Sequence, residues 1–152
     1  IKNKKPVALQ LGNLDSKRDW GHAQDYVEGI WRMVNQEEYN KNFKEPKDYV
    51  IATGETHTIR EFLEKSLAHA GIPFEKNDTT IEGQQIAYFN PETGDPLVYI
   101  NPKYFRPAEV NILLGNPTQI ENDLEWTRKV SFDDLVKRMV DKDLELVQNF
   151  DS

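Results

Sequence analysis

Apolar residues recur at helical spacing shortly after the amino-terminal segment of the chain. From His22 onward they fall at intervals of three and four residues, which places them on one face of a helix: Ala23, Tyr26, Val27, Ile30, Trp31 and Val34. The spacing predicts an amphipathic helix that begins near His22. The polar and charged segment 35–47, which contains Pro46, predicts an exposed connecting loop after it.

A short apolar run and a second helical pattern follow this loop. Residues 49–52 (Tyr-Val-Ile-Ala) predict a short buried strand that ends in a Thr53-Gly54 turn. The segment Thr58-Ile-Arg-Glu61 is a capping box and predicts the start of a second helix, which Gly71 ends. The apolar face of this helix comprises Ile59, Phe62, Leu63, Leu67 and Ala70.

Strand-like patterns dominate the middle of the chain. The apolar segments 86–89 and 97–100 flank the turn-rich segment 90–95 and predict a hairpin, and Ala8 to Leu11 reads as a further strand. Because strand and helix patterns alternate without a repeat or a linker, we expect one α/β domain over residues 1–152.

Two helix starts are marked near the carboxy-terminus. Asn116-Pro117 predicts a short helix toward Leu124, with proline in its first turn. Ser131 is expected to cap the last helix. Its apolar positions again repeat helically: Phe132, Leu135, Val136, Met139, Val140, Leu144 and Val147.

Composition limits the class of protein. The 152 residues suffice for a core, and 38% hydrophobic with 30% charged residues is ordinary for a soluble α/β domain. A net charge of −7 argues against nucleic-acid or anionic-membrane partners. The chain has no cysteine, no apolar run of about 20 residues and no signal-peptide pattern, so we expect a cytoplasmic protein. Because the chain opens at Ile1 without methionine, we also expect it to be part of a longer one.

Two basic segments are candidates for anion binding. Lys17 and Arg18 lie between the first strand with its Gly12-Asn13 turn and the first helix, and the forked donors of an arginine match a phosphate. Composition alone favours ordinary surface charges as the interpretation of these two cations. Arg106 and Glu109 are three residues apart, so in a helical turn they share a face, where most such pairs are surface salt bridges.

Other chemistry is weakly supported. The three histidines are far apart and lack metal-ligand spacing, so we expect no metal site. The acidic pair Asp133-Asp134 lies at a helix start, where negative charge favours the helix dipole, so we do not assign it acid–base chemistry. No Gly-x-Gly-x-x-Gly segment occurs, and we expect neither catalytic nor cofactor-binding residues in this chain.

Several motifs together resemble one enzyme family. The segment GNLDSKRDWGHAQDYV (12–27) is similar to the signature of GDP-mannose 4,6-dehydratases, which are extended short-chain dehydrogenases/reductases acting on nucleotide sugars. The segments 104–110, 114–117 and 124–126 resemble the carboxy-terminal pattern of the same family in the same order. The resemblance runs from about Ala8 to Asp143.

The resemblance implies a fold and an activity. The fold would be the small α/β substrate-binding lobe of a two-lobed enzyme, with a Rossmann dinucleotide-binding domain upstream that holds NADP and against which an apolar surface packs. The complete enzyme would convert GDP-mannose to GDP-4-dehydro-6-deoxy-mannose with loss of water, on the route to GDP-fucose, and would form a homo-oligomer. This chain alone would be inactive. A related epimerase or reductase, or a non-catalytic nucleotide-sugar-binding module, are the alternatives.

The resemblance also assigns roles to individual residues. Arg18 and Arg106 would contact the diphosphate, Glu109 would accept hydrogen bonds from ribose hydroxyls, and Tyr104 would pack beside the nucleotide. Lys17 is a weaker candidate, because neighbouring side chains on an extended segment point in opposite directions. Three further residues have open assignments: Asn13 either shapes its turn or binds the ligand, Trp20 is core or site wall, and His57 is structural or lines the base pocket.

Overall fold

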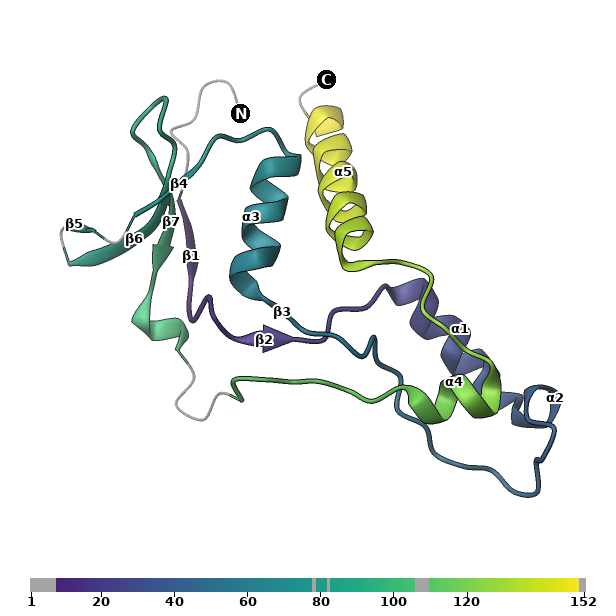
Figure 1. Cartoon of the computed structure of the whole chain (residues 1–152). Helices are drawn as coiled ribbons and strands as arrows, with labels where there is room; N and C mark the ends of the chain where they lie inside the picture. Colours follow the sequence, from purple (N-terminus) through teal and green to yellow (C-terminus); the bar gives the residue numbers. More distant parts are fainter. Residues whose placement is uncertain (1–7, 78, 82, 106–109, 151–152) are drawn as a thin grey trace. The chain divides into compact units, whose positions relative to one another are not determined.

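The structure is a computed structural model that describes residues 8–77, 79–81, 83–105 and 110–150. The chain forms two compact units. The first contains residues up to 16, 58–111 and those from 140 onward, and the second contains residues 17–57 and 112–139. The chain passes between the units several times, so no single linker separates them, and this explains why the sequence shows no boundary. Figure 1 shows the order of the elements along the chain.

A mixed sheet forms the centre of the first unit, and it confirms the predicted first strand and hairpin. The central strand β7 pairs in parallel with β1, with Leu9 opposite Val98, and antiparallel with β6. The order across the sheet is β1-β7-β6-β4, and β5 also pairs with β6. The strands are β1 (Leu9–Leu11), β4 (Glu75–Lys76), β5 (Thr80–Ile81), β6 (Gln84–Phe89) and β7 (Pro96–Ile100).

Helix α3 (Ile59–His69) packs on this sheet, and both predicted end signals are confirmed. Thr58 and Glu61 form the reciprocal capping box, each side chain accepting from the other's backbone N–H at 3.0 Å. At the other end Gly71 has a positive φ of 68°, and the N–H of Ile72 donates to the carbonyl of Leu67. The buried cluster between helix and sheet comprises Leu14, Leu63, Ala87, Tyr88 and Val98.

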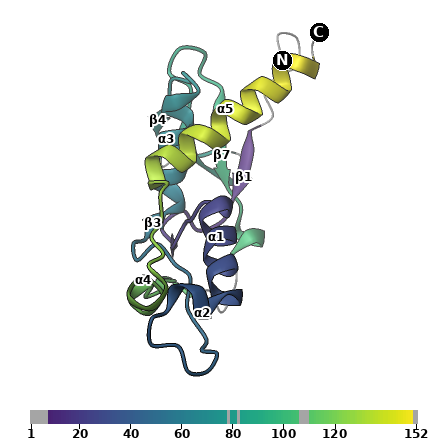
Figure 2. The same cartoon turned by 90° about the vertical axis from the view of Figure 1, so that its right-hand side faces the viewer.

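The second unit is mainly helical. Its core is a cluster of Ile120, Leu124 and Trp126, which are at most 1% exposed. Its elements are β2 (Lys17–Arg18), α1 (Ala23–Val34), α2 (Gln36–Tyr39), α4 (Thr118–Leu124) and the first residues of α5 (Phe132–Phe150). Strand β2 pairs with β3 (His57–Thr58), of which only His57 belongs to this unit. Figure 2 gives a second view of these helices. No helix of the described residues has the length and apolar character needed to span a bilayer.

The predicted first and last helices are confirmed, with one unexpected orientation. The ring Nδ1 of His22 caps α1 by accepting from the N–H of Gln24, and Ser131 caps α5 by accepting from the N–H of Asp134. In α1, however, Asp25 and Gly29 are the buried residues. Four residues of the apolar stripe are more than half exposed: Val27, Ile30, Trp31 and Val34.

Three sequence predictions need correction. Residues 49–52 are not a strand: among the described residues no neighbouring strand bonds to their backbone, although Tyr49 and Ile51 pack on the core of the second unit. Segment 35–47 is not wholly a loop. It contains α2, because Gln36 is buried and its side chain exchanges two hydrogen bonds with the backbone of Lys47. The fourth helix begins at Thr118, one residue later than expected.

Candidate functional site

Arg18 lines a cavity of about 300 Å³ in the second unit. Its other described walls are Asp19, Tyr26, and residues 50–52 and 113–115, so Arg18 is the one cation that lines it within the part of the chain that the structure describes. The arginine lies in the two-residue strand β2, and its Nη1 donates to the carbonyl of Lys17 at 2.8 Å. The described walls carry one guanidinium and one carboxylate on a mostly apolar surface, and the guanidinium suits a ligand with an anionic part.

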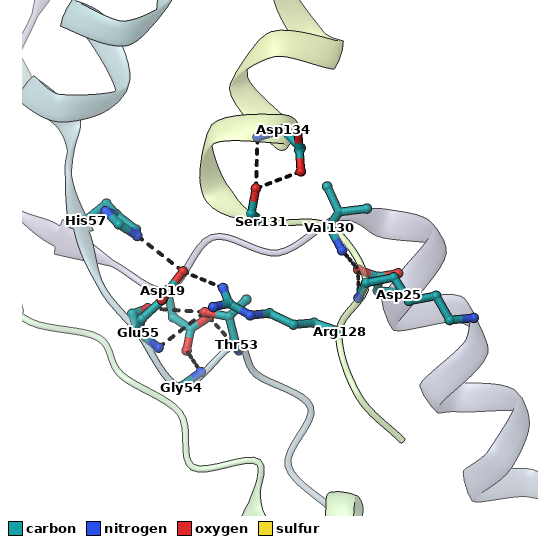
Figure 3. Close-up of polar contacts among 11 residues, drawn as sticks. Asp19, Asp25, Thr53, Gly54, Glu55, His57, Arg128, Val130, Ser131 and Asp134 are labelled. Carbon is teal, nitrogen blue, oxygen red and sulfur yellow. Dashed lines mark hydrogen bonds and ion pairs between the residues drawn. The ribbon is translucent and has the colours of Figure 1, made fainter. Parts of the chain in front are cut away.

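Asp19 ties this wall to two other segments. One oxygen, Oδ1, accepts from the backbone N–H of Thr53 at 2.8 Å and from its hydroxyl at 2.7 Å. The other, Oδ2, accepts from the N–H groups of Gly54 at 3.2 Å and Gly115 at 3.3 Å. Figure 3 shows the carboxylate between Thr53 and Gly54. Both oxygens of Asp19 are therefore occupied by donors of the protein.

A second polar cluster lies beside Asp19. Arg128 forms an ion pair with Glu55, and this hydrogen bond holds the pKa of the Glu55 carboxyl below its usual value. The ring of His57 stacks on Phe132, with ring centroids 3.8 Å apart and planes 4° from parallel. Its Nε2 lies 3.4 Å from Oε1 of Glu55. These contacts favour the structural assignment of His57 over a place in a base pocket.

Asp25 fixes the helix that follows the site. It is 4% exposed, and its Oδ2 accepts from the N–H groups of Lys129 and Val130, each at 3.0 Å. Its backbone carbonyl accepts from the indole Nε1 of Trp126 at 2.8 Å. Helix α1 and the segment 126–130 are therefore joined by three hydrogen bonds at one residue.

A second cavity adjoins the first in the same unit. Its volume is about 520 Å³, and it shares Leu114 and Gly115 with the Arg18 cavity. Its remaining walls include Thr53, Asn116 and Glu121. Leu114 and Gly115 therefore border both cavities.

The predicted site residues are placed as follows. Lys17 and Arg18 lie side by side in β2 of the second unit, where Lys17 is exposed and its carbonyl also accepts from Leu113. Trp20 is half-buried there. Asn13 and Tyr104 belong to the first unit, after the parallel strands β1 and β7.

In the first unit, Oδ1 of Asn13 accepts from the N–H of Asp15 at 2.9 Å, so this side chain shapes its own turn. Tyr104 ends the 3₁₀ turn η1 (Pro102–Tyr104) and is exposed. Arg106 and Glu109 lie outside the described residues.

The sequence reasoning missed Asp19 and Asp25 as anchors. The helix spacing gave no signal for Asp25, since a carboxylate in a first helical turn is ordinary at a surface. Tyr99 and Lys103 have Tyr-x-x-x-Lys spacing, but they lie in β7 and η1 with Pro102 between them. They are therefore not on successive turns of one helix, and we assign them no catalytic role.

Comparison with solved structures defines the class of fold. A putative epimerase from Burkholderia cenocepacia superposes with a TM-score of 0.64 at 18% identity, covering 89% of this chain and 35% of that one. A structure titled RMD from Pseudomonas aeruginosa complexed with NADPH gives a TM-score of 0.61 at 15% identity, covering 88% and 35%. The fold is that of part of the nucleotide-sugar branch of the short-chain dehydrogenases/reductases.

Sequence comparison defines the family within this class. A family profile described as GDP-mannose 4,6 dehydratase matches residues 1–139. The chain is 47% identical over 143 residues to GDP-mannose 4,6 dehydratase of Dictyostelium discoideum, covering 94% of this chain and 37% of that protein. It is 46% identical over 143 residues to the enzyme so named from Homo sapiens, covering 92% and 35%. The chain belongs to the GDP-mannose 4,6-dehydratase family and spans little more than a third of its relatives' length, at their carboxy-terminal part.

Proposed function

We propose that this chain is the substrate-binding part of a GDP-mannose 4,6-dehydratase. The observation that carries the proposal is the placement of Arg18, from the signature segment of the family, on the wall of a cavity in the second unit. In this proposal Arg18 and Arg106 hold the diphosphate, Glu109 accepts from the ribose, and Lys17, Asn13 and Tyr104 border the nucleotide.

Binding of the nucleotide would assist a reaction that takes place on the hexose part of the substrate. Binding energy from the GDP part orients the hexose and limits its motion, so the reacting carbon is held in place during the reaction. The proposed role of this chain is therefore positioning. The product would be GDP-4-dehydro-6-deoxy-mannose, a precursor of GDP-fucose.

The NADP of the proposed reaction does not fit residues of this chain. The sequence contains no Gly-x-Gly-x-x-Gly turn, and Tyr99 and Lys103 are not arranged on a helix. The cofactor, which would carry the hydride, is therefore assigned to a Rossmann domain in the part of the relatives that this chain does not cover. We further propose a cytoplasmic homo-oligomer for the complete enzyme.

The exposed apolar residues of α1 fit the proposal that the cofactor is bound by another domain. Val27, Ile30, Trp31 and Val34 project more than half of their surface from one helix face. Apolar surface of this kind is stabilised by burial, at about 25 cal/mol per Å². We propose that the Rossmann domain covers this stripe and also supplies a strand that bonds to the extended segment 49–52.

We expect Arg18→Ala and Arg106→Ala to weaken binding of GDP-mannose by roughly 1.5–3 kcal/mol each in the full-length enzyme, because each removes a charge-assisted contact to the same diphosphate. Affinity for NADP should stay the same. Isothermal titration calorimetry measures both constants. Arg138→Ala is the matched control, since Arg138 is exposed on α5 and the charge change is identical. Unchanged GDP-mannose binding in both site variants would remove these residues from the site.

We expect the isolated 152-residue chain to be inactive, because it has no dinucleotide turn and no helical Tyr-Lys pair. Purified chain incubated with NADP and GDP-mannose should give no 4-keto product by chromatography. Turnover above a control without protein would show that the catalytic groups lie in this chain after all, and would contradict the assignment of chemistry to another domain.

A further inference from the structure

We infer that Asp19 is the positioning residue for Arg18: its carboxylate fixes the segment that presents the arginine to the cavity. The inference rests on the proposed function, because Arg18 is the group that binds the diphosphate there. It adds to the site a residue that acts on the ligand only through its neighbour.

Both carboxylate oxygens of Asp19 accept hydrogen bonds from other segments of the second unit. Asp19 accepts four hydrogen bonds, from the amide and hydroxyl of Thr53 and from the amides of Gly54 and Gly115, at 2.7 to 3.3 Å. These donors lie 34, 35 and 96 positions away in the sequence. The carboxylate therefore joins three separate segments of the second unit at one point.

The same hydrogen bonds explain how a carboxylate can sit next to a group that binds phosphate. A free carboxylate would repel an anionic ligand and compete with it for the guanidinium of Arg18. Here both oxygens are directed to N–H and O–H donors of the protein, which lower the charge density that a ligand would meet. Asp19 can thus lie on the same cavity wall as Arg18 without cancelling its attraction.

Because Asp19 directly follows Arg18 in the chain, the anchoring of Asp19 also limits the position of Arg18. Consecutive Cα atoms are about 3.8 Å apart, so fixing Asp19 restricts where the Arg18 side chain starts. A long arginine side chain loses up to about 2 kcal/mol of rotamer entropy when it is held in one geometry. When the backbone is already fixed, less conformational entropy is lost on binding, and the affinity for the ligand is higher.

A purely structural role would give a different result in a double-mutant cycle. Asp19→Asn keeps the size of the side chain but turns one acceptor oxygen into an NH₂ group, which faces N–H donors. We expect it to weaken binding of GDP to the full-length enzyme about tenfold. In an Arg18→Ala background the same change should have no further effect on the affinity for GDP, because Asp19 affects binding only through Arg18.

Asp25→Asn is the matched control. Asp25 lies in the same unit and also accepts backbone N–H groups, but it is not beside Arg18. We expect this variant to lower the melting temperature and to leave GDP affinity within about twofold. Thr53→Val gives a milder test if Asp19→Asn does not fold. It removes the hydroxyl bond to Asp19, together with the longer bonds of that hydroxyl to the backbone of Glu55 at 3.2 and 3.3 Å, and leaves the three backbone donors to Asp19 in place. It should weaken GDP binding less than Asp19→Asn and only when Arg18 is present.

Different results would contradict the positioning role of Asp19 and the proposed diphosphate site. If Asp19→Asn lowers affinity equally with and without Arg18, or if neither it nor Thr53→Val changes affinity, the positioning role is wrong and the proposed function stands. If Arg18→Ala leaves GDP binding unchanged, the proposed diphosphate site is wrong, and the inference falls with it.

Discussion

Replacing Trp126 with alanine is expected to lower the free energy of unfolding by about 3–5 kcal/mol. The side chain is 1% exposed and packs with Ile120 and Leu124 at the centre of the second unit. Its indole Nε1 also donates to the carbonyl of Asp25, so alanine would leave both a cavity and a buried acceptor without its donor. No small side-chain movement can fill the space of an indole.

Urea unfolding of the 152-residue chain, followed by circular dichroism at the helix band, measures this loss. Trp31→Ala is the matched control: the same residue type is removed, but Trp31 is 60% exposed on α1. We expect the control to change stability by no more than about 0.5 kcal/mol. Similar losses in the two variants would mean that Trp126 is not the centre of this core.

Helix ends could be predicted because their signals are local. Thr58 and Ser131 each accept a backbone N–H three residues ahead, and the sequence alone shows such caps. The hairpin of β6 and β7 is local in the same sense. The parallel pairing of β1 with β7 could not be foreseen, since its partners are about ninety residues apart and no turn fixes their register.

The predictions that failed concern segments whose structure depends on residues far away in the sequence. The apolar run 49–52 has the composition of a strand, but a strand also needs a neighbour to bond with, and none of the described residues supplies one. The stripe of α1 was correctly placed on one helix face. Spacing alone did not show that the Asp25 and Gly29 side would face Trp126, because that contact depends on residues about a hundred positions away.

The candidate site likewise contains one residue that could be predicted from the sequence and one whose role could not. Arg18 could be named from its chemistry and from the family resemblance, and the structure places it on a cavity wall. The anchoring by Asp19 could not, because an aspartate beside an arginine looks like an ordinary surface pair. Its four donors come from two loops that the fold alone brings together.

Gly115→Ala is expected to cost about 3 kcal/mol of stability, at the upper end of the range for overpacking. A Cβ on Gly115 would lie 2.2 Å from the Cβ of Ala52, whereas carbon atoms pack at about 3.5–4.0 Å. Neither atom is the tip of a flexible side chain, so the backbone must move. Because the N–H of Gly115 donates to Asp19, the same movement should weaken GDP binding.

The double variant Ala52→Gly with Gly115→Ala tests the cause, because it moves one methyl group across the contact and restores the total volume. We expect it to recover most of the lost stability, less up to about 1 kcal/mol for the added glycine. Thermal unfolding and GDP titration of both variants measure the two effects. If the single variant were as stable as the parent chain, residues 52 and 115 could not be as close as described. If the double variant failed to recover, the cost would arise from something other than this contact.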